Sequence, residues 1–158
     1  MAEQFYANRY ASILYRYCQR FLADALRQKK LPLESAQLPV FLRCAHQPGI
    51  TQEEIAAITG LDKATVARTA AALEERGFLH RSADPADRRV NRLALTAQGS
   101  ALLAPVEEIA DQLHEALYQG LSRAEQDEAC RLLVQMCGNL RAAVQQGRAK
   151  GCGEGAAR

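Results

Sequence analysis

The chain has 158 residues, 48% of them hydrophobic, which is enough for one domain with a substantial core and helical extensions. No apolar run approaches the ~18 residues of a membrane span and no leader pattern opens the chain, so we expect a cytoplasmic protein without a membrane partner. With 20 basic and 18 acidic residues the net charge is +2, so any nucleic-acid binding must depend on local geometry.

The first predicted element is a helix from Phe5 to about Lys29, ended by Leu31-Pro32. Its apolar residues recur at helical spacing and form one stripe: Tyr6, Tyr10, Ile13, Leu14, Tyr17, Phe21 and Ala25. A shorter second helix is predicted to begin near Ser35 and to end at Pro48-Gly49.

Two short helices are predicted next. Thr51-Gln52-Glu53-Glu54 is a capping box and starts the third helix, which Gly60 ends. Asp62 can cap a fourth helix that runs from Lys63 to Arg76 and stops at Gly77. The start and end signals therefore define a closely spaced helix pair.

The spacing within this pair is typical of a helix-turn-helix. A small residue, Ala56, stands where the helices would touch, Gly60 suits a left-handed turn, and Val66 can lock the second helix against the first. The surrounding apolar positions are Ile55, Ile58 and Leu61. An ordinary helical hairpin is the alternative.

A β-hairpin follows, with strands predicted over 78–81 and 91–95 and a turn-rich loop over 82–89. A hairpin directly after a helix-turn-helix is a wing. Guanidinium groups at a wing tip can enter a narrow minor groove, and Asp87 can hold a neighbouring arginine by a bidentate pair. The alternative for this loop is a solvated charged turn.

The last predicted elements are two long amphipathic helices. Thr96 caps the first, which reaches about Gln119 and is bent by Pro105. A capping box at Ser122-Arg123-Ala124-Glu125 starts the second, and the Gly-rich residues 147–158 are expected to be a flexible tail. Since a winged module needs no such helices for its own core, their apolar stripes indicate a homodimer.

The five cysteines are widely spread, without a CxxC pair or Cys/His ligand spacing, so we expect no metal site, no cofactor and no disulfide framework. Cys130 and Cys137 would lie about 10 Å apart on one helix face, too far for a bond within one chain. We interpret them as small core residues, with a redox pair as the alternative.

Four sequence runs resemble the MarR family of winged helix-turn-helix regulators: DKATVAR at 62–68, LEERGFLHR at 73–81, DPADRR at 84–89 and LALTAQG at 93–99. The resemblance implies a mainly α fold with a small β-hairpin wing. It assigns residues 33–96 to a DNA-binding domain and residues 5–32 and 97–146 to a helical dimerisation region. Two copies would place their winged domains on consecutive major grooves of double-stranded DNA.

Seven residues are the candidate DNA contacts. The recognition helix 62–76 offers Lys63, Thr65, Arg68 and Thr69, and the wing 82–92 offers Asp87, Arg88 and Arg89. Arg68 is long enough to fork onto a guanine edge, whereas Lys63 or Thr65 can contact phosphate or base. Each of these residues has a solvated side chain as its alternative role.

The resemblance also implies repression that a small ligand relieves. Tyr10, Tyr17 and Phe41 are candidate lining residues for an aromatic or phenolic effector, with a purely core role as the alternative. Peroxide-sensing relatives carry a cysteine early in the first helix, and zinc-sensing relatives carry clustered histidines. This sequence has neither, so neither sensing mode is supported.

We therefore expect a homodimeric transcriptional repressor that binds a near-palindromic operator. The alternative from another class is a winged-helix protein-interaction module without DNA binding. An enzyme is not expected, because the sequence shows no nucleophile with a nearby base, no Gly-rich phosphate loop and no cluster of metal ligands.

Overall fold

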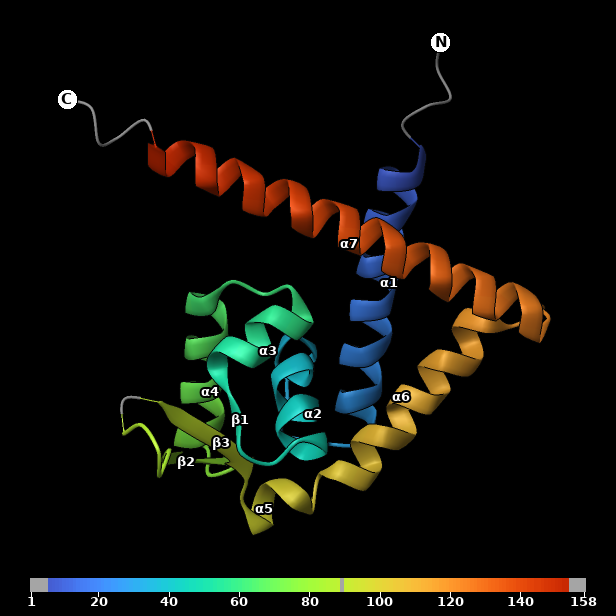
Figure 1. Cartoon of the computed structure of the whole chain (residues 1–158). Helices are drawn as coiled ribbons and strands as arrows, with labels where there is room; N and C mark the ends of the chain where they lie inside the picture. Colours follow the sequence, from blue (N-terminus) through green and yellow to red (C-terminus); the bar gives the residue numbers. More distant parts are fainter. Residues whose placement is uncertain (1–5, 89, 154–158) are drawn as a thin grey trace. The chain divides into compact units, whose positions relative to one another are not determined.

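Residues 6–88 and 90–153 are described in the computed structural model, which divides into two units, residues 1–116 and 117–158 (Figure 1). The elements are, in chain order, α1 Tyr6–Gln28, the 3₁₀ turn η1 Ser35–Gln37, α2 Leu38–His46, β1 Ile50–Thr51, α3 Gln52–Thr59, α4 Lys63–Glu75, β2 Leu79–Ala83, β3 Asn91–Leu95, α5 Ala97–Ser100, α6 Leu103–Tyr118 and α7 Arg123–Gly153. This order confirms a mainly helical fold with a small antiparallel sheet. Among the described residues, no helix is both long and apolar enough to span a membrane.

The predicted boundaries of the helix pair α3 and α4 are confirmed by their caps. The Thr51 hydroxyl accepts the Glu54 N–H, and the Glu54 carboxylate accepts the Thr51 N–H at 2.8 Å. Gly60 ends α3 at φ +74°, a left-handed conformation that glycine adopts without a steric penalty. Asp62 then caps α4 by accepting the Thr65 N–H at 2.8 Å.

The sheet contains one strand that the sequence pattern did not indicate. Its order is β1-β3-β2, and β3 pairs antiparallel with both neighbours, placing Thr51 and Ser82 opposite Arg92. β1 has two residues, too few for an alternating pattern to be visible. It nevertheless joins the start of α3 to the hairpin.

The long fifth helix was predicted wrongly, because the chain forms α5 and α6 with a break at Ala101–Leu102. Pro105 explains the position of the break. It has no N–H to donate to the Ala101 carbonyl, and its ring would clash with that carbonyl in a continuous helix. The proline therefore lies in the first turn of α6, where the missing N–H has little cost.

The core of the first unit lies between α1, α2, α4, the sheet and α6. Its buried residues include Leu26, Phe41, Val66, Leu93 and Ile109, and the larger set also contains Val40, Cys44, Ile50, Ile55, Ala70, Leu73 and Val106. Ile58 was expected among the apolar positions of the helix pair but is exposed. The side of α3 that faces the core carries Ile55, Ala56 and Thr59, whereas Ile58 lies outside that side of the helix and faces solvent.

In the second unit, α7 starts at the predicted capping box, where Ser122 N–H donates to Glu125 at 2.8 Å. The helix continues to Gly153, beyond its expected end near Gln146; residues 154–158 of the predicted tail lie outside the described residues. The expectation that Cys130 and Cys137 are core residues is wrong for the single chain, in which both are exposed.

Unlike Cys130 and Cys137, which were expected in the core, Cys44 lies in the core of the first unit. Burial in the core raises the pKa of its thiol to about 12, so the reactive thiolate is suppressed at neutral pH. We predict that a disulfide reagent such as DTNB labels Cys44 only after unfolding by urea. Cys44 labelling as fast as that of free cysteine in the native protein would contradict this burial.

Candidate nucleic-acid interface

The start of α4 holds a chain of polar contacts that ends in an exposed arginine. The Thr65 hydroxyl donates to Asp62 Oδ2 at 2.7 Å, and Arg68 Nη2 donates to the Thr65 hydroxyl at 3.0 Å. The hydrogen bonds from Thr65 hold the pKa of Asp62 below its usual range, so the cap stays ionised near neutral pH. The guanidinium of Arg68 is thereby directed along the outer face of the helix.

The four candidates on α4 differ in exposure. Lys63 and Arg68 are exposed, whereas Thr65 and Thr69 are half-buried. Lys63 Nζ lies 2.5 Å from Glu53 Oε1 of α3, and this hydrogen bond lowers the pKa of Glu53. The opposite face of α4 is fixed in the core by Val66, Ala70 and Leu73.

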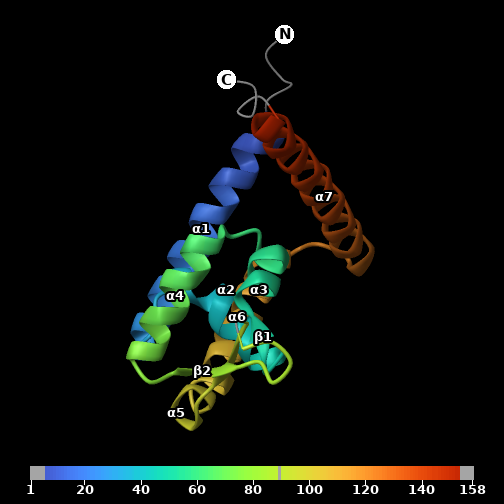
Figure 2. The ribbon, with the colours of Figure 1, turned by 60° about the vertical axis from the view of Figure 1, so that its left-hand side comes forward.

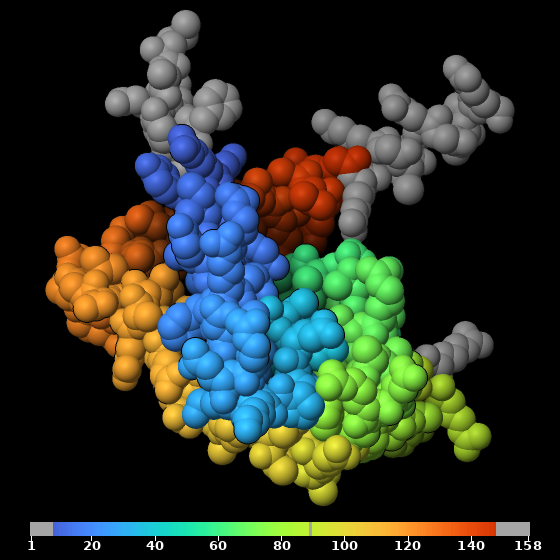
Figure 3. Space-filling view, turned by 180° about the vertical axis from the view of Figure 1, so that it is seen from behind, coloured from blue at the N-terminus to red at the C-terminus, as the bar shows by residue number. Residues whose placement is uncertain are grey.

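The wing is the β2–β3 hairpin, whose loop projects from the surface of the first unit in the space-filling view (Figure 3). Two backbone hydrogen bonds shape the loop, from Asp84 N–H to the Val90 carbonyl and from Val90 N–H to the Asp87 carbonyl, both at 2.9 Å. Asp87 and Arg88 are exposed, and Arg89 lies outside the described residues. α4 and β2 contact each other, and Figure 2 shows the helix beside the hairpin.

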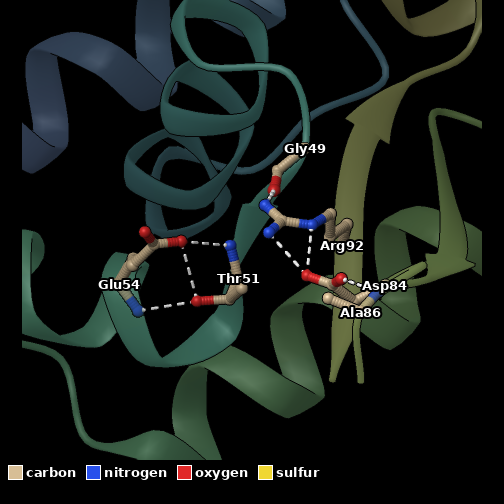
Figure 4. A network of polar contacts seen from close by, with 6 residues as sticks. All are labelled: Gly49, Thr51, Glu54, Asp84, Ala86 and Arg92. Atoms are coloured by element: carbon tan, nitrogen blue, oxygen red, sulfur yellow. Dashed lines mark hydrogen bonds and ion pairs between the residues drawn. The ribbon is translucent and has the colours of Figure 1, made fainter. Parts of the chain in front are cut away.

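A polar network at the base of the wing was missed in the sequence (Figure 4). Arg92 donates from Nε to Asp84 Oδ2 at 2.6 Å and from Nη1 to the Gly49 carbonyl at 2.8 Å. Asp84 also accepts the Ala86 N–H at 2.7 Å and is only 8% exposed. The sequence pattern indicated Asp84 only as part of a turn; its contact with Arg92 depends on the register of the β2–β3 hairpin, and the contact of Arg92 with Gly49 depends on β1.

The three candidate effector residues are not equivalent. Tyr10 and Tyr17 of α1 are 62% and 63% exposed, whereas Phe41 of α2 is completely buried in the core. An open depression at the end of α1 is lined instead by Ala23, Leu26, Arg27, Lys30, Leu31, Leu33, Glu34 and Ser35. None of the three aromatic residues lines that depression.

Comparison with known proteins agrees with this geometry. Residues 33–90 match the MarR family. The transcriptional regulator HosA of Escherichia coli O111:H- is 36% identical over 110 residues, which cover 69% of this chain and 82% of HosA. This chain belongs to the MarR family of transcriptional regulators.

Solved structures of MarR regulators have the same fold. One from Methanosarcina mazei Go1 is 28% identical with a TM-score of 0.75, covering 87% of this chain and 98% of its own. BpsR of Bordetella bronchiseptica is 27% identical with a TM-score of 0.75, covering 87% and 95%. The BpsR structure concerns the mechanism by which 6-hydroxynicotinic acid regulates DNA binding by BpsR.

Proposed function

We propose that this MarR-family regulator is a homodimeric repressor that binds a near-palindromic DNA operator through α4 and the wing and is released by a small aromatic ligand. The observation that carries the proposal is the pairing of two exposed basic elements in one unit. These are Lys63 and Arg68 on the outer face of α4, and Arg88 on the adjoining wing. A helix of this kind fits the major groove, and a wing arginine fits the minor groove beside it.

The individual roles follow from reach and charge. Arg68 is proposed to read a base edge, and Lys63 to bind a phosphate after exchanging its contact with Glu53 for the DNA backbone. Thr65 and Thr69 are half-buried and have short side chains, so they would contact DNA only if α4 lies deep in the major groove. Asp87, Arg88 and Arg89 are proposed to form the minor-groove contact of the wing.

The homodimer is supported by apolar side chains that the single chain leaves exposed. On α1 they include Leu14 and Tyr15; on α7 they are Leu132, Leu133, Val134, Met136, Leu140 and Val144. Leaving so many large apolar groups in water is unfavourable, at about 25 cal/mol for each Å². A second copy of the chain offers the same surfaces and would bury both sets.

The proposed effector is a planar aromatic acid or phenol. BpsR, a relative of similar fold, is regulated by such a molecule, and the exposed Tyr10 and Tyr17 can stack on an aromatic ring. Phe41 could contact a ligand only if the core around it opened, because it has no exposed surface. The proposal for the ligand therefore rests mainly on the two tyrosines.

The test is fluorescence anisotropy with duplexes that tile the region upstream of the gene, at about 50 and 200 mM salt. We expect tight binding to one near-palindromic segment, with an affinity that falls steeply with salt because counterions are released. Adding 6-hydroxynicotinic acid, as the first probe, is expected to weaken that binding. Absence of binding to any duplex at low salt would contradict DNA binding and favour a protein-interaction module.

A further inference from the structure

Arg92 joins the wing hairpin to a segment that lies 43 positions earlier in the sequence (Figure 4). Its backbone belongs to β3, its Nε and Nη2 lie 2.6 and 2.5 Å from Asp84 Oδ2 at the start of the wing loop, and its Nη1 donates to Gly49. Gly49 precedes β1 and has φ +86°, and its N–H donates to the Leu93 carbonyl. One guanidinium therefore ties the wing loop to the segment that leads into α3.

Asp84 links the Arg92 side chain to the wing loop. Its carboxylate accepts the Ala86 N–H, and its own N–H donates to the Val90 carbonyl, so both ends of the loop depend on one residue. The Ala86 N–H and the Arg92 guanidinium keep the pKa of Asp84 below its usual range. The carboxylate is thus charged near neutral pH and remains an acceptor for Arg92.

We infer that Arg92 and Asp84 are positioning residues that hold the wing tip in the conformation that enters the minor groove, an inference that rests on the DNA binding proposed above. A loop ordered in the free protein loses less conformational entropy on binding, so preorganisation raises affinity without a contact to DNA. The exposed Arg88 is carried by this loop, only four positions from Asp84. We call the contacts of Arg92 with Asp84 and Gly49 the brace. The brace affects DNA binding by positioning Arg88 and Arg89 at the tip of the wing loop.

Arg92 serves this role through its shape as well as its charge. Its planar fork reaches the carboxylate and the Gly49 carbonyl at once, whereas a lysine has one ammonium group and no fixed fork. Arg92→Lys therefore keeps the charge that attracts phosphate and removes the bridge. Arg81→Lys is the matched control, because Arg81 lies in the same hairpin but pairs with Glu74 of α4 at 3.1 Å.

The first experiment measures amide hydrogen exchange by NMR in the free protein. Arg92→Lys is expected to accelerate exchange at Ala86 and Val90 about tenfold, and Arg81→Lys to leave both amides at the wild-type rate. Wild-type exchange rates at Ala86 and Val90 in Arg92→Lys would overturn the inference that Arg92 holds the wing loop in place. This readout needs no DNA, so it remains decisive for the loop if the proposed DNA binding fails.

The second experiment is a double-mutant cycle on operator affinity. Arg92→Lys alone is expected to weaken binding about fivefold, and to weaken it less than about twofold in the Arg88→Ala, Arg89→Ala background. Loss of the effect in that background shows that Arg92 acts through the tip. An equal loss in both backgrounds would mean that Arg92 contacts DNA itself or only stabilises the fold, and would overturn the inference.

Discussion

The double variant Arg88→Ala, Arg89→Ala is expected to bind the operator at least about tenfold more weakly than the wild type while remaining folded and dimeric. The wing loop lies outside the hydrophobic core, and Arg88 is exposed, so truncation there removes charge without opening a cavity. If both arginines of each subunit neutralise phosphates, the dimer loses four such contacts, and the slope of log affinity against log salt decreases in magnitude by about 3.6. Anisotropy titrations at several salt concentrations measure both effects.

The control for this variant removes the same charge elsewhere. Arg27 and Arg123 are 76% and 82% exposed, and each forms a short-range surface ion pair, with Asp24 and Asp127. Such pairs contribute little to stability, so Arg27→Ala, Arg123→Ala is expected to keep the wild-type fold. If this control weakened DNA binding as much as the wing variant did, net charge would explain the result and the wing would have no specific role.

Gly99→Ala is expected to reduce the free energy of unfolding by about 3 kcal/mol or more. A Cβ at Gly99 would stand 2.1 Å from the Phe78 carbonyl oxygen, well inside contact distance. That oxygen cannot move away easily, because it also accepts the Thr96 N–H at 3.0 Å. In addition, the Thr96 hydroxyl binds the Gly77 carbonyl at 2.6 Å, which fixes α5 against the junction of α4 and β2.

Urea unfolding followed by circular dichroism measures this change. Gly138→Ala is the matched control, since among the described residues no atom outside the adjoining residues and backbone of its own helix lies within 4 Å of the added Cβ. Alanine is a better helix former than glycine by about 1 kcal/mol, so this control is expected to be neutral or stabilising. A Gly99→Ala protein as stable as the wild type would show that α5 can move away from Phe78.

Local rules made much of the fold predictable from the sequence. Capping boxes at Thr51 and Ser122, the Asp62 cap and the turn glycine Gly60 act through hydrogen bonds and sterics within a few residues. Such interactions are visible in any short window of sequence, which is why the helix pair and the hairpin were placed correctly. The break before Pro105 follows from an equally local rule, although the prediction had allowed only a bend.

Part of the candidate site was also visible in the sequence. The exposed Lys63 and Arg68 occupy the outer face of α4 because Val66, Ala70 and Leu73 take its inner face at helical spacing. The sequence could not separate Phe41 from Tyr10 and Tyr17, since all three lie on apolar stripes. Burial depends on which neighbours cover each stripe, and only the packing of α2 into the core decided that Phe41 is enclosed.

The sequence by itself determined the order of the helices, the turn within the helix pair and the wing, because each depends on residues close together in the chain. The tertiary structure decided the partners of residues far apart. Arg92 and Gly49 are separated by 43 positions, and no local pattern links them until β1 pairs with β3. The β1–β3 pairing brings the Gly49 carbonyl to the Arg92 guanidinium, and the β2–β3 pairing brings the Asp84 carboxylate to it.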